Sequence, residues 1–98
     1  MFERIQDDDE KISFEVNDHY KIILKLEDPP FANQLVLEKD DVDIFNVSVS
    51  YDKSKQIQRC MKNNETTYES FISLLTQLKL TNFVNEISRN MSPVNLGI

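Results

Sequence analysis

The sequence predicts an α+β domain in which an antiparallel meander of four or five strands is followed by two C-terminal helices packed on one of its faces. Two observations lead to this fold class. Apolar and polar residues alternate through the first half of the chain, and from residue 65 the apolar residues recur with a helical period. With 98 residues, of which 40% are hydrophobic, the chain can bury one core, so we expect 1–98 to form a single domain.

A hairpin is the first predicted element. Residues 11–17 and 20–27 both alternate between apolar and polar side chains, as half-buried strands do. The residues at 17–19 are Asn, Asp and His, and Asn and Asp tolerate the left-handed backbone conformation of short hairpin turns. The sequence therefore predicts two paired strands joined by this turn.

The remaining strands are predicted after a proline break. Pro29 and Pro30 interrupt the ladder because proline has no N–H to donate, and a third short strand is expected over 33–38. Alternation resumes over 44–51, which predicts a fourth strand. Residues 53–62 fit a fifth strand or a short helix, and the strand directly before them together with the turn-like Asp-Lys-Ser-Lys at 52–55 favours the strand. Strand order is left open, and so is a small barrel closed by a C-terminal helix.

Two helices are predicted in the second half. The first covers about 66–79. Its start fits a capping box in which Thr66 is the N-cap and Glu69 occupies the third helical position, and a continuous apolar stripe follows. The second begins at Thr81 or the next residue and continues to about Arg89. We therefore divide the chain into an acidic N-terminal segment, a sheet, helices and a loose tail, at 1–10, 11–62, 65–90 and 91–98.

The charges are distributed unevenly along the chain. Residues 1–52 contain 14 acidic and 5 basic residues, whereas residues 53–98 contain 3 acidic and 6 basic residues, and the whole chain has a net charge of -6. An acidic half argues against nucleic acid as the main ligand, because phosphate binding depends on clustered Lys and Arg. It favours a protein partner with a basic surface.

Two acidic stretches are the candidate contacts for such a partner. The first is the N-terminal run, in which the spacing of Phe2 and Ile5 also suggests a short helix. The second leads into the fourth predicted strand, where charged residues beside a strand can meet a basic surface. The residues that we expect to bind a partner are Asp7, Asp8, Asp9, Glu10, Glu38, Asp40, Asp41 and Asp43.

The sequence contains no complete motif for binding a metal ion or a phosphate-bearing cofactor. Asp41 and Asp43 have the first spacing of a calcium loop, but no glycine follows and the closing position falls at Asp52. The only glycine is Gly97, so no glycine-rich phosphate loop can form. We therefore predict neither a cofactor nor a metal site.

Catalysis is not expected either. His19 lies in a predicted turn and Cys60 in a separate segment, so their spacing gives no reason to pair them as base and nucleophile. Acidic side chains are abundant, but acid and base catalysis needs a desolvated cleft, for which a domain this small has little room. The chain is predicted not to be an enzyme.

One basic segment stands apart from the acidic half. Lys53, Lys55, Arg59 and Lys62 occur without any acidic residue from 53 to 64, which is typical of a solvated face or of a patch for nucleic acid or an acidic protein. Aromatic residues are not interleaved with these cations, so base stacking is unsupported and direct nucleic-acid binding is not expected.

The sequence favours a non-catalytic protein that inhibits or regulates a basic partner, such as a nucleic-acid-processing protein. In size and acidity the chain is similar to phage and plasmid inhibitors of nucleases and defence enzymes and to immunity proteins, a similarity of general character that carries over no residues. A structural or adaptor subunit that docks through the C-terminal helices is the alternative, and a homo-oligomer stays open. The first residues lack the pattern of a signal peptide, no apolar run would span a membrane, and Cys60 has no partner for an internal disulfide, so we expect a cytoplasmic protein without membrane contact.

Overall fold

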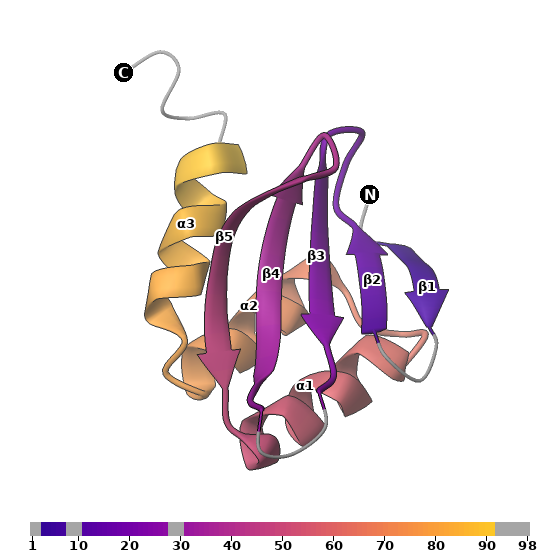
Figure 1. Cartoon of the computed structure of the whole chain (residues 1–98). Coiled ribbons are helices and arrows are strands. Elements are labelled where there is room, and N and C mark those ends of the chain that lie inside the picture. The colour runs from indigo at the N-terminus through magenta and orange to yellow at the C-terminus, as the bar shows by residue number, and fades with distance from the viewer. Residues whose placement is uncertain (1–2, 8–10, 28–30, 92–98) are drawn as a thin grey trace.

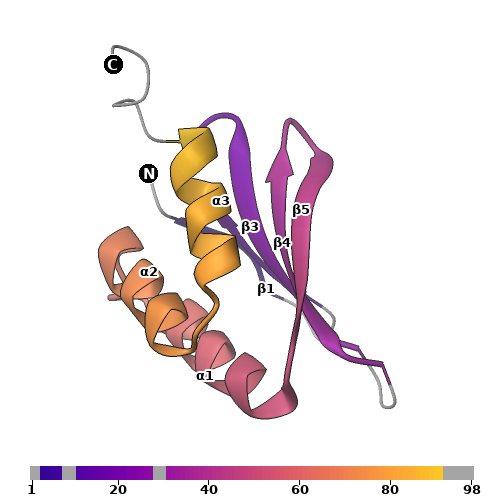
Figure 2. The same cartoon turned by 90° about the vertical axis from the view of Figure 1, so that its left-hand side faces the viewer.

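The computed structural model describes residues 3–7, 11–27 and 31–91 and confirms the α+β class. Five strands form one antiparallel sheet in the order β1-β2-β3-β4-β5, and three helices follow them along the chain. Figure 1 shows this meander, and Figure 2 shows that all three helices lie on the same side of the sheet. The elements are β1 (Glu3–Asp7), β2 (Lys11–Glu15), β3 (Tyr20–Lys25), β4 (Asn33–Lys39), β5 (Val42–Val49), α1 (Tyr51–Lys62), α2 (Tyr68–Gln77) and α3 (Thr81–Met91).

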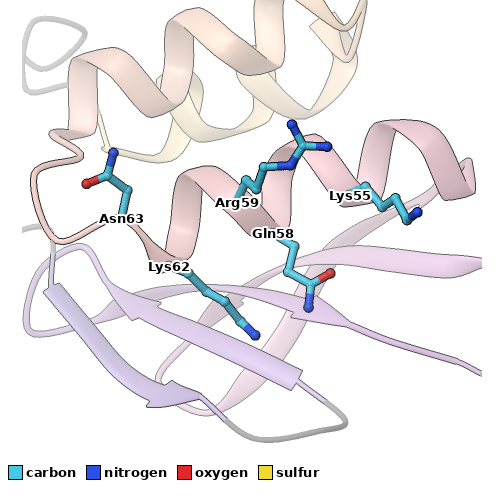
Figure 3. Close-up of a pocket in the computed structure, with 5 residues that line it drawn as sticks. All are labelled: Lys55, Gln58, Arg59, Lys62 and Asn63. Atoms are coloured by element: carbon cyan, nitrogen blue, oxygen red, sulfur yellow. The ribbon is translucent and has the colours of Figure 1, made fainter.

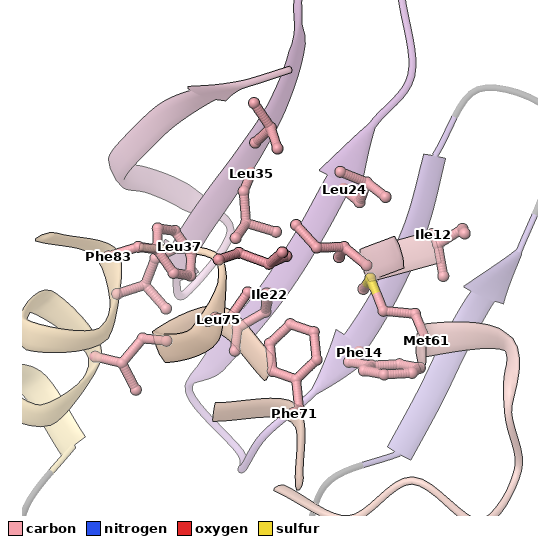
Figure 4. Packing of buried hydrophobic residues seen from close by; sticks show 14 of the residues in the cluster. Ile12, Phe14, Ile22, Leu24, Leu35, Leu37, Met61, Phe71, Leu75 and Phe83 are labelled. Carbon is pink, nitrogen blue, oxygen red and sulfur yellow. The ribbon is translucent and has the colours of Figure 1, made fainter. Parts of the chain in front are cut away.

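The core lies between the sheet and the helices. Alternate residues of the strands point toward the helices, so that the row Phe14, Ile22 and Leu37 faces the helical layer. The helices contribute large side chains such as Phe71, whose ring meets that of Phe14 edge-on with a centroid distance of 6.2 Å. Figure 4 shows this packing. The fully buried core residues are Ile12, Ile22, Leu24, Leu35, Leu37, Ile57, Phe71, Leu75, Phe83 and Ile87, each 0% exposed.

Residues 53–62 form a helix, so the interpretation of this segment as a fifth strand is wrong. Helix α1 starts immediately after β5, and the Ser50 side chain caps it by accepting a hydrogen bond from the backbone N–H of Lys53. Ser54, Ile57 and Met61 are its buried residues, and their spacing is that of one helical face. The fifth strand of the sheet is instead β1, formed by residues of the predicted acidic N-terminal segment. The helix suggested there by Phe2 and Ile5 is therefore also wrong.

The ends of the C-terminal helices differ in detail from the prediction. The capping box of α2 uses Thr67 as the N-cap and Ser70 as its partner, one residue later than predicted. At the other end, Lys79 has a φ of 66°, and the backbone N–H of Leu80 donates to the carbonyl of Leu75 at 3.0 Å, which forms a Schellman-type cap. Helix α3 extends to Met91, and the rest of the predicted tail lies outside the described residues.

A buried hydrogen-bond network joins the start of α1 to the sheet. The Asn33 side chain, 8% exposed, donates from Nδ2 to Ser54 Oγ at 2.7 Å and accepts the backbone N–H of Glu27 at 2.8 Å. Ser54 Oγ donates in turn to the carbonyl of Tyr51 at 2.8 Å. These polar groups satisfy one another, so the network can be buried and sets where α1 leaves the sheet.

Replacing Ser54 tests this network. We expect Ser54→Ala to lower the free energy of unfolding by about 1–3 kcal/mol, because the buried Asn33 amide then loses its acceptor. Ser48→Ala, at an exposed position of β5, is the matched control and should change stability by less than about 0.5 kcal/mol. Urea denaturation of both variants measures the difference, and equal midpoints would contradict the assigned role.

Candidate functional site

Two turns meet at one end of the sheet. The β2–β3 turn at 17–19 and the β4–β5 turn at Asp40 and Asp41 adjoin because Tyr20 pairs with Lys39 where β3 begins and β4 ends. Two contacts join them directly: the backbone N–H of Asp40 donates to the carbonyl of His19 at 2.8 Å, and His19 Nδ1 lies 2.8 Å from Asp40 Oδ1. Both turns are at the top of Figure 1. We call the five carboxylates gathered here the acidic tip: Asp18, Glu38, Asp40, Asp41 and Asp43.

The β4–β5 turn has an unusual sequence for its backbone. Asp40 and Asp41 have φ values of 50° and 68°, as in the two-residue hairpin turns that prefer Asn-Gly or Asp-Gly. Aspartate tolerates this conformation better than most residues, but it still costs more than glycine, by on the order of 1 kcal/mol. The backbone of this turn therefore accommodates a carboxylate at both central positions and presents the two side chains to solvent.

Lysines of β3 partly compensate the acidic tip. Lys21 Nζ lies 3.0 Å from Asp41 Oδ1, and Lys25 Nζ lies 3.5 Å from Asp43 Oδ2. Because β4 lies between β3 and β5, the second ion pair crosses β4 on the face away from the helices, where Val36 is fully buried. Exposed ion pairs of this kind contribute about 0–1 kcal/mol each, so they hold the carboxylates of the tip only weakly.

Glu38 carries the perturbed carboxyl group of the acidic tip. It lies on β4 in a cross-strand row between Lys21 of β3 and Asp43 of β5. Burial, followed by a hydrogen bond with the Asp43 side chain and repulsion from its charge, raises the pKa of the Glu38 carboxyl above its usual value. Lys21 opposes this effect without cancelling it. The Glu38 carboxyl therefore holds its proton more readily than an isolated glutamate, and a cation placed beside it would relieve the repulsion from Asp43.

The predicted contact residues do not form a single surface. Glu38, Asp40, Asp41 and Asp43 come together, but only Asp40 and Asp41 lie in a turn, and Asp43 belongs to β5 and not to the predicted connection. Asp7 is the last residue of β1 and pairs with Ile12, at the end of the sheet opposite Asp40. The predicted contacts Asp8, Asp9 and Glu10 lie outside the described residues.

Sequence reasoning missed the contribution of the β2–β3 turn. Asp18 and His19 are exposed beside Asp40, 21 residues away from His19 in the sequence. Only the strand order creates this proximity, so no local pattern could have indicated it. The same contact gives His19 a carboxylate partner, whereas the Cys60 thiol lies 3.7 Å from the Thr66 hydroxyl on the helical side.

Searches of protein-family models, curated proteins and solved structures found no match to this chain. Within 3–7, 11–27 and 31–91, no group of three His, Cys, Asp or Glu side chains is arranged to hold a metal ion. None of the helices in these ranges has the length and apolar character needed to cross a membrane. The function has to be inferred from the chemistry of the surface.

The perturbed Glu38 predicts a pH-dependent effect on stability. Because the pKa of the Glu38 carboxyl is raised, the folded state binds this proton more tightly than the unfolded state does. The resulting stabilisation is complete below the pKa that Glu38 has in the unfolded chain. It is lost as pH rises through the pKa that Glu38 has in the folded protein. Glu38→Gln should therefore raise the free energy of unfolding at neutral pH by roughly a few tenths of a kcal/mol and have little effect near pH 4. Thermal midpoints measured at both pH values check this expectation.

The Asp43→Asn background is the control for this measurement. Removing the Asp43 charge removes its repulsion of Glu38, so the neutral-pH gain from Glu38→Gln should shrink in that background. A gain from Glu38→Gln that is the same at all pH values would contradict the raised pKa of Glu38. A gain unaffected by Asp43→Asn would show that the two carboxyl groups do not interact.

Proposed function

We propose that this chain is a non-catalytic protein-binding protein that inhibits or regulates a partner with a basic surface, and that the acidic tip contacts the partner. The observation that carries the proposal is the joining of the two turns by the hydrogen bond from Asp40 to His19. It gathers carboxylates from separate segments on one small, ordered surface. Complementary charge of this kind speeds association and selects the partner.

The exposure of the tip also suits recognition. The side chains of Asp40, Asp41 and Asp43 are 60%, 81% and 44% exposed, so a partner can reach them directly. The ordered turn limits the conformational entropy lost on binding. Lysine or arginine side chains of a partner would replace the weak pairs with Lys21 and Lys25 and add a countercharge near Glu38, which favours an arginine-rich or lysine-rich surface such as that of a nucleic-acid-processing protein.

The alternative of a subunit that docks through its C-terminal helices has less support. The large apolar residues of α2 and α3, such as Phe71 and Phe83, are used in the core. The large hydrophobic residues that are exposed in the described part of the chain lie in the β3–β4 connection, in β5 and at the start of α1: Phe31, Val42, Ile44 and Tyr51. We also propose a cytoplasmic location, because the single cysteine leaves the chain without an internal disulfide, as is usual in a reducing compartment. Self-association stays an open alternative.

Neutralising the tip should abolish partner binding without unfolding the protein. We propose the triple variant Asp40→Asn, Asp41→Asn and Asp43→Asn, because asparagine keeps the size of the side chain and tolerates the positive φ of the turn. Affinity capture from a lysate of the source cell or its host, eluted with a salt gradient, should retain a basic protein on the wild type and lose it on the variant.

The control carries the same change in net charge at another place. Asp52→Asn, Glu65→Gln and Glu69→Gln remove three acidic charges from the helical layer, and this variant should still retain the partner. Equal loss of binding by both triple variants would show that binding depends on the net charge of the protein and not on the position of the acidic residues. Retention of the partner by both variants would contradict the proposed contact surface. The thermal midpoint of each variant verifies that it is folded.

A further inference from the structure

A second surface lies on the solvent-facing side of α1. Tyr51, Lys55, Arg59 and Lys62 are all exposed, whereas Ser54, Ile57 and Met61 on the opposite side of the helix are buried. With 3.6 residues per turn, the four exposed residues fall within an arc of about 80° and span about 17 Å of helix. The sequence alone already showed the cations of this segment, and the helix places Tyr51 in line with them.

The basic part of this surface forms a pocket. It has a volume of about 480 Å³ and is lined by Lys55, Gln58, Arg59, Lys62 and Asn63, so its lining contains three cations and two amides. Figure 3 shows Arg59 extending toward the side of α2 and Lys62 toward the side of the sheet, which spreads the positive charge across the width of the helix. Lysine and arginine side chains with neighbouring amides are the groups that contact phosphate oxygens.

Two exposed aromatic rings lie at one end of the basic pocket. Phe31 is 71% exposed and Tyr51 is 68% exposed, and both line a pocket of about 260 Å³ whose lining also includes Glu27, Asn33 and Val49. Lys55 Nζ lies 4.8 Å from the centre of the Tyr51 ring, so the aromatic pocket and the basic pocket adjoin. The rings come from the β3–β4 connection and from the start of α1, 20 residues apart in the sequence. Exposed rings that are gathered in this way indicate a contact site.

We propose that this face of α1 binds a short segment of single-stranded nucleic acid. Cations beside exposed aromatic rings are the combination that such ligands require, because the cations contact phosphates while bases stack on the rings. The absence of aromatic residues among the cations had argued against nucleic acid, but the fold supplies Phe31 from a distant segment. The length of the surface suits a segment on the order of four nucleotides.

The net negative charge of the chain does not prevent this binding. Strand β5 runs from the acidic tip, at Val42, to Val49 beside the aromatic pocket, and its eight residues separate the two surfaces by roughly 25 Å. Ionic screening at physiological salt acts over about 8 Å, so the carboxylates of the tip have little influence at α1. Closer to the surface, Asp52 lies in the first turn of α1 and Glu27 lines the aromatic pocket. Both carboxylates are at the end that carries the rings, whereas the basic pocket is lined by three cations and no acid. The two surfaces can therefore act independently.

Fluorescence anisotropy with a short labelled oligothymidylate and the full chain tests the proposal. We expect binding at low salt that weakens as salt rises, with a logarithmic slope of about 2 for three phosphate contacts. Tyr51→Ala and Phe31→Ala should each weaken binding roughly 5-fold to 150-fold and leave the slope unchanged, because stacking on a ring does not depend on salt. The double variant Lys55→Ala and Arg59→Ala should instead weaken binding and reduce the slope.

A matched control removes charge from elsewhere. Lys39→Ala together with Lys79→Gly also removes two cations and should leave binding unchanged. Absence of binding at low salt would overturn the proposal, as would binding that is insensitive to both ring substitutions. Competition by polyglutamate as effective as that by unlabelled oligonucleotide would assign the surface to an acidic protein instead. Tip variants such as Asp41→Asn should bind the oligonucleotide as the wild type does. If the wild type does not bind the oligonucleotide, only the nucleic-acid proposal is overturned, and the proposed function of the acidic tip is unaffected.

Discussion

The pairing of β3 with β4 is the constraint on which the other features of this molecule depend. Its register places Tyr20 opposite Lys39 at one end and Lys25 opposite Gln34 at the other. The first pair brings the two acidic turns together, and the second end leads to Asn33, which anchors α1 through Ser54. A shift of this register by one residue would turn the apolar face of one strand to solvent, so core packing and the positions of both surfaces are determined together.

The fold separates two kinds of charge to opposite ends of one sheet. Hairpin turns at one end gather carboxylates, while the helix that follows β5 presents lysine and arginine at the other. The uneven charge distribution along the chain thus becomes a spatial separation, because the sheet comes from the first half, with 14 acidic and 5 basic residues, and α1 carries four cations with a single acidic residue. The contact proposed for a basic protein and the contact proposed for a single-stranded nucleic acid therefore lie on separate surfaces.

Local pattern predicted those elements whose formation depends on their own residues. Alternation identified β2, β3 and β5, and the apolar stripe identified α2, because burial on one face imposes these periods. Residues 53–62 were misassigned because Asp-Lys-Ser-Lys at 52–55 resembles a turn between strands, whereas Ser50 caps a helix there. Ser54 also weakens the apolar helical pattern, because it is a polar core residue whose burial depends on Asn33, 21 positions earlier. Only part of the candidate site was predicted, because its other contacts also join residues that are distant in the sequence. The acidic character of 38–43 is visible in the sequence, whereas the contact of Asp40 with His19 and the separation of Asp7 follow from strand order.

Amide hydrogen exchange at Asp40, measured by NMR, is the most direct test of the central claim that the two turns form one ordered acidic surface. The backbone N–H of Asp40 donates to the carbonyl of His19, so it should exchange at least ~10-fold more slowly than the same amide in an unstructured peptide. Protection of this amide would mean that the turns are held together in solution. Exchange at the unstructured rate would show two independent turns, and the acidic tip would then lose its basis as a preorganised binding surface.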